Sequence, residues 1–170
     1  MFETIQPEAL TENVFDLIGN RWFLLTAGDR AGGFNPMTVS WGGLGILWGR
    51  RVATCYVRPQ RYTRAFMEKC GYFTLSVYPE ALRGVYDLCG SKSGRDVDKV
   101  KEAGLTPVFT PQGAVYFAEA ELVFVCKKLY FADFDPANFL DPSIFDSYPE
   151  RDFHRMYVGE ILALLQKKKD

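Results

Sequence analysis

Residues 35–41, Asn35-Pro36-Met37-Thr38-Val39-Ser40-Trp41, alternate between apolar and polar side chains from Met37 onward. Met37, Val39 and Trp41 would share one face of a strand. Thr38 and Ser40 would share the opposite face. This alternation predicts a β-strand with one packed face and one face free to make polar contacts.

Short runs rich in β-branched and aromatic residues predict further strands on both sides of this stretch. They span Trp22–Ala27, Val52–Arg58, Tyr72–Tyr78, Val115–Phe131 with a break near Glu119, and His154–Gln166. Gly28–Gly33 predicts the turn that leads from the first of these runs toward Met37.

Four segments predict short helices between the strands. Thr11 would cap a helix that ends at Ile18, with Gly19 as a left-handed stop. The other three cover Arg61–Lys69, a stretch opened by Pro79, and a stretch from about Gly94 to near Gly104.

These elements follow no regular β-α-β alternation, so a doubly wound parallel sheet is disfavoured. Roughly six or seven strands with short helices between them favour a mainly β protein with α insertions, built on an antiparallel barrel or curled sheet. We expect one domain over residues 1–170, with residues 1–19 as a helical N-terminal extension.

The composition narrows the function classes. The net charge of −1 gives no electrostatic case for nucleic acid. The N-terminus has no apolar stretch typical of a signal peptide, and no run is long enough to span a membrane. One histidine excludes a multi-histidine metal cluster, and no metal site is expected. The four dispersed cysteines are expected to be reduced thiols in a cytoplasmic protein.

The glycine-rich stretch Gly42–Gly49 invites comparison with a dinucleotide-binding loop. The pattern G-x-G-x-x-G from Gly43 would need a glycine where Trp48 stands, and no helix pattern follows. We therefore interpret the stretch as a turn between two strands.

Two segments carry groups that suit an anion. Ser91, Lys92, Ser93 and Arg95 would lie at the start of the helix from Gly94, where free amide groups and the helix dipole favour negative charge. Plain capping by Ser93 is the stronger alternative on these residues alone. Arg58–Thr63 places Arg61 and Thr63 in the first turn of another helix, and a solvated surface loop is the alternative there.

His154 has no nucleophile elbow to serve, so a Ser-His-Asp triad is excluded. A structural or surface histidine is the simplest interpretation of this residue.

Taken in order, five blocks of the sequence resemble the flavin reductase family of FMN-binding split-barrel proteins, and its flavoredoxin-like branch in particular. The blocks are Asn35–Gly43, Val57–Thr63, Tyr72–Ser76, Cys89–Asp96 and His154–Ile161. No single motif among them is diagnostic, and the resemblance rests on their order from about Asn20 to Ile161.

The resemblance implies a Greek-key split β-barrel that forms a homodimer, with one FMN per subunit near the interface. Thr38 and Ser40 would contact the flavin ring, and Phe34, Trp41 and Tyr62 are aromatic groups available to cover it. His154 would close the site near the flavin or a pyridine nucleotide. The two anion-prone segments described above would hold the phosphate. The full expected cofactor site consists of Asn35, Met37, Thr38, Val39, Ser40, Trp41, Arg58, Arg61, Tyr62, Thr63, Ser91, Lys92, Ser93, Arg95 and His154.

The leading functional hypothesis is an NAD(P)H-dependent flavin reductase or a closely related flavoprotein oxidoreductase. Hydride transfer to a flavin needs no acid–base side chain, so we name no catalytic residue. An electron carrier with tightly bound FMN is the first alternative. A split barrel that binds another ligand such as haem, or that serves as a dimeric scaffold, is the second.

Overall fold

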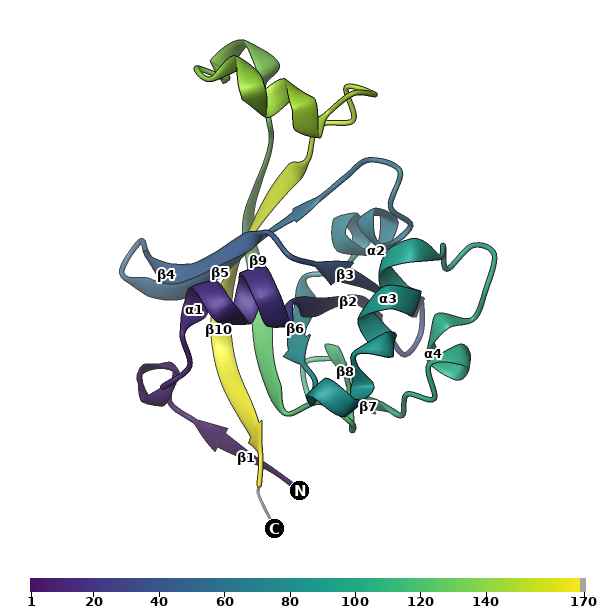
Figure 1. Ribbon diagram of the computed structural model, residues 1–170. Helices are drawn as coiled ribbons and strands as arrows, with labels where there is room; N and C mark the ends of the chain where they lie inside the picture. Colours follow the sequence, from purple (N-terminus) through teal and green to yellow (C-terminus); the bar gives the residue numbers. More distant parts are fainter. Residues whose placement is uncertain (169–170) are drawn as a thin grey trace.

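The computed structural model describes residues 1–168, and an antiparallel β-sheet runs through it (Figure 1). Its strands are β1 (Phe2–Ile5), β2 (Phe23–Asp29), β3 (Gly33–Val39), β4 (Gly42–Leu47), β5 (Arg50–Val57), β6 (Tyr72–Val77), β9 (Leu122–Asp133) and β10 (Arg155–Lys167). A separate pair consists of β7 (Pro107–Phe109) and β8 (Val115–Phe117). The α-helices are α1 (Val14–Asp16), α2 (Thr63–Lys69), α3 (Gly84–Ser91) and α4 (Lys99–Glu102).

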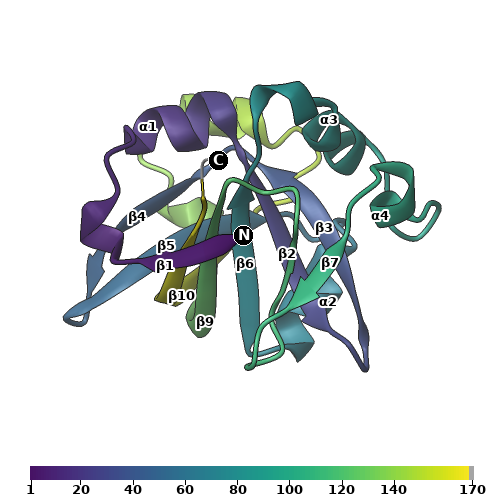
Figure 2. The same cartoon turned by 90° about the horizontal axis from the view of Figure 1, so that it is seen from below.

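The large sheet has the order β3-β2-β6-β9-β10-β5-β4, and β1 pairs with β10 outside this path. Every pairing in it is antiparallel. The expectation of a mainly β, antiparallel, curled sheet with helical insertions is confirmed. Figure 2 shows the strongly twisted strands below α1 and α3.

The sheet is buried on both faces along β2, because successive residues of a strand point to opposite sides. Leu25 packs with Phe73 and Phe124 in one apolar cluster, which also contains Met67 of α2. Leu24 packs in a second cluster with residues of α3 such as Tyr86. The helices α2 and α3 therefore cover opposite faces of β2, and between them they fix the position of β3.

The strand β10 has an irregularity at Gly159, where the register with β9 shifts. A Cβ atom at this position would lie 2.5 Å from Cζ of Phe73 and 2.9 Å from Cβ of Cys126. The backbone of β10 thus passes closer to the core aromatic ring than a residue with a side chain would permit.

The N-terminal residues differ from the expected helical extension. Phe2–Ile5 forms β1, which is a strand only through its pairing with the distant β10. Asn13, and not Thr11, caps α1 by accepting hydrogen bonds from the amides of Phe15 and Asp16. Gly19 lies within a π-helical stretch, Leu17–Arg21, so it does not end the helix.

The glycine-rich stretch is the edge strand β4 for most of its length, so its interpretation as a turn was wrong. The reversal is confined to Trp48 and Gly49, whose φ values are 53° and 69°. A Cβ at Gly42 would lie 2.6 Å from the carbonyl oxygen of Thr54, so the glycine permits close pairing with β5.

The chain segment between β9 and β10 projects from the sheet as an arm, drawn in yellow-green at the top of Figure 1. It contains the 3-10 turns Pro136–Asn138 and Pro142–Ser147. Phe139, Tyr148 and Phe153 pack together in this arm with ring centroids 5.1 to 6.0 Å apart. The arm therefore has its own aromatic core. It ends at His154, directly before β10.

None of the helices described within residues 1–168 is long and apolar enough to cross a membrane. The four cysteines are free thiols. Over the same residues, no group of three or more His, Cys, Asp or Glu side chains is arranged to hold a metal ion.

Candidate functional site

A cavity of about 250 Å³ lies where β3, β5 and the start of β10 converge. We call it the central cavity. Its lining consists of Met37, Thr38, Val39, Ser40, Trp41, Tyr56, Arg58, Arg61 and His154. Eight of these nine residues belong to the site expected from the sequence, and they come from four separate parts of the chain.

The end of β3 presents the expected alternation for residues 37–39, but the strand ends at Val39, and Trp41 is exposed instead of lying on the packed face. Met37 and Val39 are buried in the core, whereas Ser40 is exposed. Thr38 is partly buried, and its hydroxyl donates a 2.6 Å hydrogen bond to the Tyr86 carbonyl at α3. This bond leaves the oxygen of Thr38 able to accept a further hydrogen bond from a ligand. The polar face of the strand therefore lines the central cavity.

Trp41 and His154 pack against each other in the lining of the cavity. Their ring centroids lie 5.0 Å apart, and the indole is 46% exposed. Tyr56 also packs on His154, at 6.4 Å. Tyr56 was not among the site residues expected from the sequence. The alternation of the strand could have indicated it, because Tyr56 and Arg58 are two residues apart and lie on the same face.

His154 is buried and neutral under most conditions. Nδ1 lies 2.8 Å from the hydroxyl of Tyr148. Burial, reinforced by the positive charge of Arg58, lowers the pKa of His154 to about 4, and Asp152 opposes this shift only in part. The imidazole therefore acts near pH 7 as an uncharged group.

Arg58 is committed to an ion pair instead of projecting as a free anion ligand. Its Nη1 lies 2.5 Å from Oδ2 of Asp152, and its Nη2 donates to the Ser147 carbonyl at 2.8 Å. The guanidinium also lies over the Tyr148 ring at 5.0 Å. These contacts anchor the arm beside the cavity, so the simple role of phosphate ligand expected for Arg58 is not supported by its partners.

A second cavity, of about 170 Å³, adjoins the first through Arg61. We call it the basic cavity. It is lined by Gln60, Arg61, Tyr62, Thr63, Ser91, Lys92, Ser93 and Lys99. The two anion-prone segments of the sequence, Arg58–Thr63 and Ser91–Arg95, therefore meet in space although about 30 residues separate them in the chain.

The helix-start argument for the second of these segments was wrong. Ser91 is the last residue of α3, and its hydroxyl donates to the Asp87 carbonyl. Residues 94–97 form a turn, and α4 begins only at Lys99 with Asp98 as its N-cap. This turn packs tightly against β3, because a Cβ at Gly94 would overlap the side chain of Asn35.

Lys99 brings a positive charge to the basic cavity that no sequence pattern marked. It is 4% exposed, and its Nζ donates to the carbonyls of Cys89 (2.8 Å) and Pro36 (3.1 Å). Burial lowers the pKa of Lys99 to about 8. Arg61 donates to the neighbouring Gly90 carbonyl at 2.6 Å. Both cations thus satisfy the C-terminal carbonyls of α3 and add positive potential at the same place.

Lys92 is the basic side chain of this cavity with the most freedom. Its side chain is 49% exposed and pairs with Glu102, with Nζ 2.9 Å from Oε2. An exposed ion pair of this kind contributes little to stability and can exchange partners. Lys92 therefore remains available to an anionic ligand.

Two of the expected site residues, Asn35 and Arg95, line neither of these cavities. Asn35 and Thr63 are buried and bond to each other, with Nδ2 of Asn35 2.7 Å from Oγ1 of Thr63. Arg95 lies over the Tyr62 ring at 4.7 Å and, like Asn35, lines a separate depression beyond β3. Of the three aromatic residues expected to cover a ring, Trp41 lines the central cavity and Tyr62 lines the basic cavity, whereas Phe34 packs on Phe109 and Phe117.

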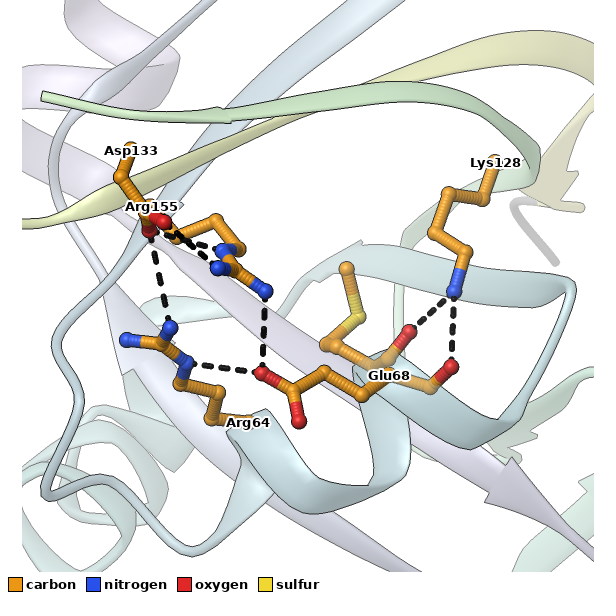
Figure 3. Close-up of polar contacts among 6 residues, drawn as sticks. Arg64, Glu68, Lys128, Asp133 and Arg155 are labelled. Atoms are coloured by element: carbon orange, nitrogen blue, oxygen red, sulfur yellow. Dashed lines mark hydrogen bonds and ion pairs between the residues drawn. The ribbon is translucent and has the colours of Figure 1, made fainter.

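A cluster of charged side chains joins α2 to β9 and β10 (Figure 3). Arg155 contacts Asp133 through Nε (2.7 Å) and Nη2 (2.5 Å), and its Nη1 reaches Glu68 at 3.1 Å. Arg64 bridges the same two carboxylates. Lys128 donates to the carbonyls of Met67 and Glu68. Arg155 is adjacent in sequence to His154 of the central cavity, and α2 begins at Thr63 of the basic cavity. The cluster therefore links the chain segments that line the two cavities.

The donor set fits FMN. The central cavity has aromatic walls, hydroxyls and the imidazole, which suit a planar polar ring. The basic cavity supplies hydroxyls and cations, which suit a phosphate. Arg61 lines both, so the two kinds of chemistry are adjacent.

Comparisons with known proteins agree with this geometry. The family model described as flavin reductase like domain matches residues 16–170. A search among curated proteins returns no match. Among solved structures, the FMN-binding domain of a flavin reductase-like enzyme from Shewanella baltica aligns with a TM-score of 0.69 at 16% identity, over 98% of this chain and 77% of that one.

Two flavoredoxins have similar folds. The protein from Methanosarcina acetivorans aligns with a TM-score of 0.69 at 19% identity, over 96% of this chain and 74% of its own. The protein from Desulfovibrio vulgaris (Miyazaki F) gives 0.68 at 21% identity, over 96% and 78%. These likenesses confirm the split-barrel fold.

Proposed function

Because the chain belongs to the flavin reductase like domain family, we propose that it is an FMN-binding oxidoreductase that accepts electrons from NAD(P)H. The observation that carries this proposal is the meeting of the central cavity and the basic cavity at Arg61. An arrangement with a ring-sized polar compartment beside a cationic one is what a flavin mononucleotide requires.

Thr38, Ser40 and Trp41 would hold the ring, and Ser91, Lys92 and Ser93 would hold the phosphate together with Arg61. When bound, FMN supplies the ability to accept a hydride and to release electrons singly or in pairs. The chain itself orients the ring, excludes water from one side with Trp41 and supplies hydrogen-bond donors.

Lys92→Ala tests the assignment of the basic cavity. We expect it to weaken FMN binding about tenfold and riboflavin binding by less than about twofold, because only FMN carries the phosphate that a charged donor would bind. Flavin fluorescence quenching measures both affinities. Lys101→Ala is the matched control, since it removes a nearby exposed lysine of α4, and it should change neither affinity. Equal losses for both flavins in Lys92→Ala would contradict the assignment.

The electron donor is tested by mixing the protein with FMN and either NADH or NADPH and following nucleotide oxidation. Turnover with one donor supports the reductase. Yellow protein that keeps its flavin through gel filtration and reacts slowly with both donors would favour the electron-carrier alternative. Colourless protein without FMN quenching would overturn the flavin proposal and favour a split barrel for another ligand.

We also propose a homodimer with FMN near its interface. Its support is apolar surface beside the site. A depression of about 610 Å³ lined by Phe15, Leu44, Phe134 and Ile144 shares Trp41 and Tyr56 with the central cavity. Phe15 is 87% exposed there. Sedimentation should give a dimer mass, and Phe15→Glu should shift it toward the monomer; a wild-type monomer at micromolar concentration would contradict the dimer.

The free thiols support a reducing compartment, and we propose the cytoplasm.

A further inference from the structure

We propose that Tyr148 is a positioning residue that holds His154 as the neutral tautomer with its proton on Nε2, so that the central cavity contains a fixed hydrogen-bond donor. The tautomer itself is independent of the proposed function. The use of this donor on a ligand rests on the proposed function.

The contact that sets the tautomer is the 2.8 Å approach of the Tyr148 hydroxyl to Nδ1 of His154. A phenol is a better donor than a neutral imidazole N–H, and an imidazole nitrogen is a better acceptor than a phenol oxygen. The Arg58 guanidinium 5.0 Å above the Tyr148 ring strengthens this polarity, because a cation draws electron density from the phenol oxygen. The hydroxyl therefore donates to Nδ1, and the ring proton remains on Nε2.

Nε2 is the ring nitrogen that the Tyr148 hydroxyl does not occupy. It has no hydrogen-bond partner among residues 1–168. The buried side-chain polar atoms without a partner in that part of the chain belong to Thr26, Ser76, Tyr78, Asp152 and Tyr157, so Nε2 is not enclosed. Since His154 lines the central cavity, the accessible nitrogen opens into it.

Three aromatic rings fix the direction of this donor. Trp41, Tyr148 and Tyr56 lie 5.0, 5.5 and 6.4 Å from the imidazole, each between ring centroids. Rotation of the imidazole would break the Tyr148 hydrogen bond and displace these rings. The Nε2–H is consequently preorganised, which is the condition under which a donor contributes most to binding.

The charges around the imidazole keep the donor neutral. Arg58 opposes protonation of the ring. Asp152 acts in the opposite direction, but its Oδ2 accepts hydrogen bonds from Arg58 and Gln60, and Tyr148 occupies Nδ1. Tyr56 contributes an uncharged ring. A neutral donor favours a ligand atom with a lone pair, such as a carbonyl oxygen or an unprotonated ring nitrogen, and it gives no attraction to a cation.

Because His154 is the one histidine of the chain, its imidazole can be observed without ambiguity. Long-range ¹H–¹⁵N NMR of the ligand-free protein at pH 7 should show a protonated Nε2 and an unprotonated, hydrogen-bonded Nδ1. Tyr148→Phe should give a mixture of tautomers. A wild-type proton on Nδ1, or an unchanged spectrum in Tyr148→Phe, would overturn the proposal.

Phe145→Leu is the control for the packing of the arm. Phe145 packs on Phe139 and Phe153 in the same arm. Its replacement should leave the imidazole spectrum as in the wild type. If Tyr148→Phe loses its fold, the ligand-free wild-type spectrum still decides the tautomer, because it needs no variant.

In a second step of the experiment, FMN and then oxidised nicotinamide nucleotide are added to the same sample. A shift of the Nε2 resonance on the first or the second addition identifies which molecule accepts the bond. Binding detected by fluorescence without any shift would refute the donor role. Absence of FMN binding would refute the proposed function instead, while the tautomer would still be decided by the ligand-free spectra.

Discussion

A buried histidine couples folding to pH when its ordinary pKa lies near neutrality. His154 is 8% exposed and its pKa is lowered to about 4, against 6.5 for a free histidine. Between these two values the unfolded chain binds a proton that the folded protein does not bind. The free energy of unfolding therefore falls as the pH decreases through this range, and the contribution of His154 is complete above about pH 6.5.

We predict that acidification from pH 7 to pH 5 lowers the free energy of unfolding by about 1 to 2 kcal/mol through this residue. Urea titrations at several pH values measure the effect. His154→Gln should remove most of this slope, because no other side chain of the sequence normally titrates in the interval. A slope that is the same in both proteins would show that His154 is protonated in the folded state.

The hairpin of β4 and β5 shows how an element can depend on two residues. Trp48 and Gly49 both adopt positive φ, as a tight turn between twisted strands requires. A Cβ atom at Gly49 would meet no other atom, so a substitution there causes no steric clash with neighbours. It causes only backbone strain from the positive φ. The backbone conformation alone explains the glycine.

Gly49→Ala should lower the free energy of unfolding by about 1 kcal/mol, because an alanine in the left-handed region carries a steric penalty. Gly45→Ala in the neighbouring strand is the control, since it also has open space but has no positive φ. Its effect should be within about 0.5 kcal/mol of zero. Thermal unfolding followed by circular dichroism compares the two, and equal losses would contradict the role of φ.

The same elements show what the sequence could predict. The alternation of residues 37–41 is local, so the strand and its polar face were predictable from it. The strand β4 was not, because its glycines have low strand propensity and pair only against β5. Polar composition indicated both segments of the basic cavity, but the turn at Gly94 and the burial of Lys99 depend on contacts with β3 that no local pattern encodes.

At the scale of the whole molecule, the charged cluster of Figure 3 joins one helix to two strands of the sheet. Arg155 belongs to β10, Glu68 to α2 and Asp133 to β9. The Arg155 side chain is 17% exposed, whereas those of Asp133 and Glu68 are 55% and 46% exposed, so solvent screens these ion pairs in part. The cluster should act as a unit and not as independent pairs.

Arg155→Met should lower the free energy of unfolding by about 1 kcal/mol, because Asp133 and Glu68 lose one of the two guanidinium groups that bridge them, while Arg64 remains. Arg155→Lys should recover less than half of this loss, since a lysine cannot form the two parallel bonds to Asp133. Urea denaturation measures the stability of each. Full recovery by lysine would show that charge alone, without the forked geometry, holds α2 to the sheet.

The tight passage of Gly159 over Phe73 has a consequence for how this sequence can diverge. Position 159 has no room for a side chain while position 73 holds a phenylalanine. A side chain at position 159 is therefore tolerated only where position 73 has become smaller and the Cβ of Cys126 has moved slightly away, so a change at 159 should be accompanied by a smaller residue at 73. A lineage that acquires alanine at 159 is expected to carry leucine or a smaller residue at 73. The change at position 73 should come before the change at position 159.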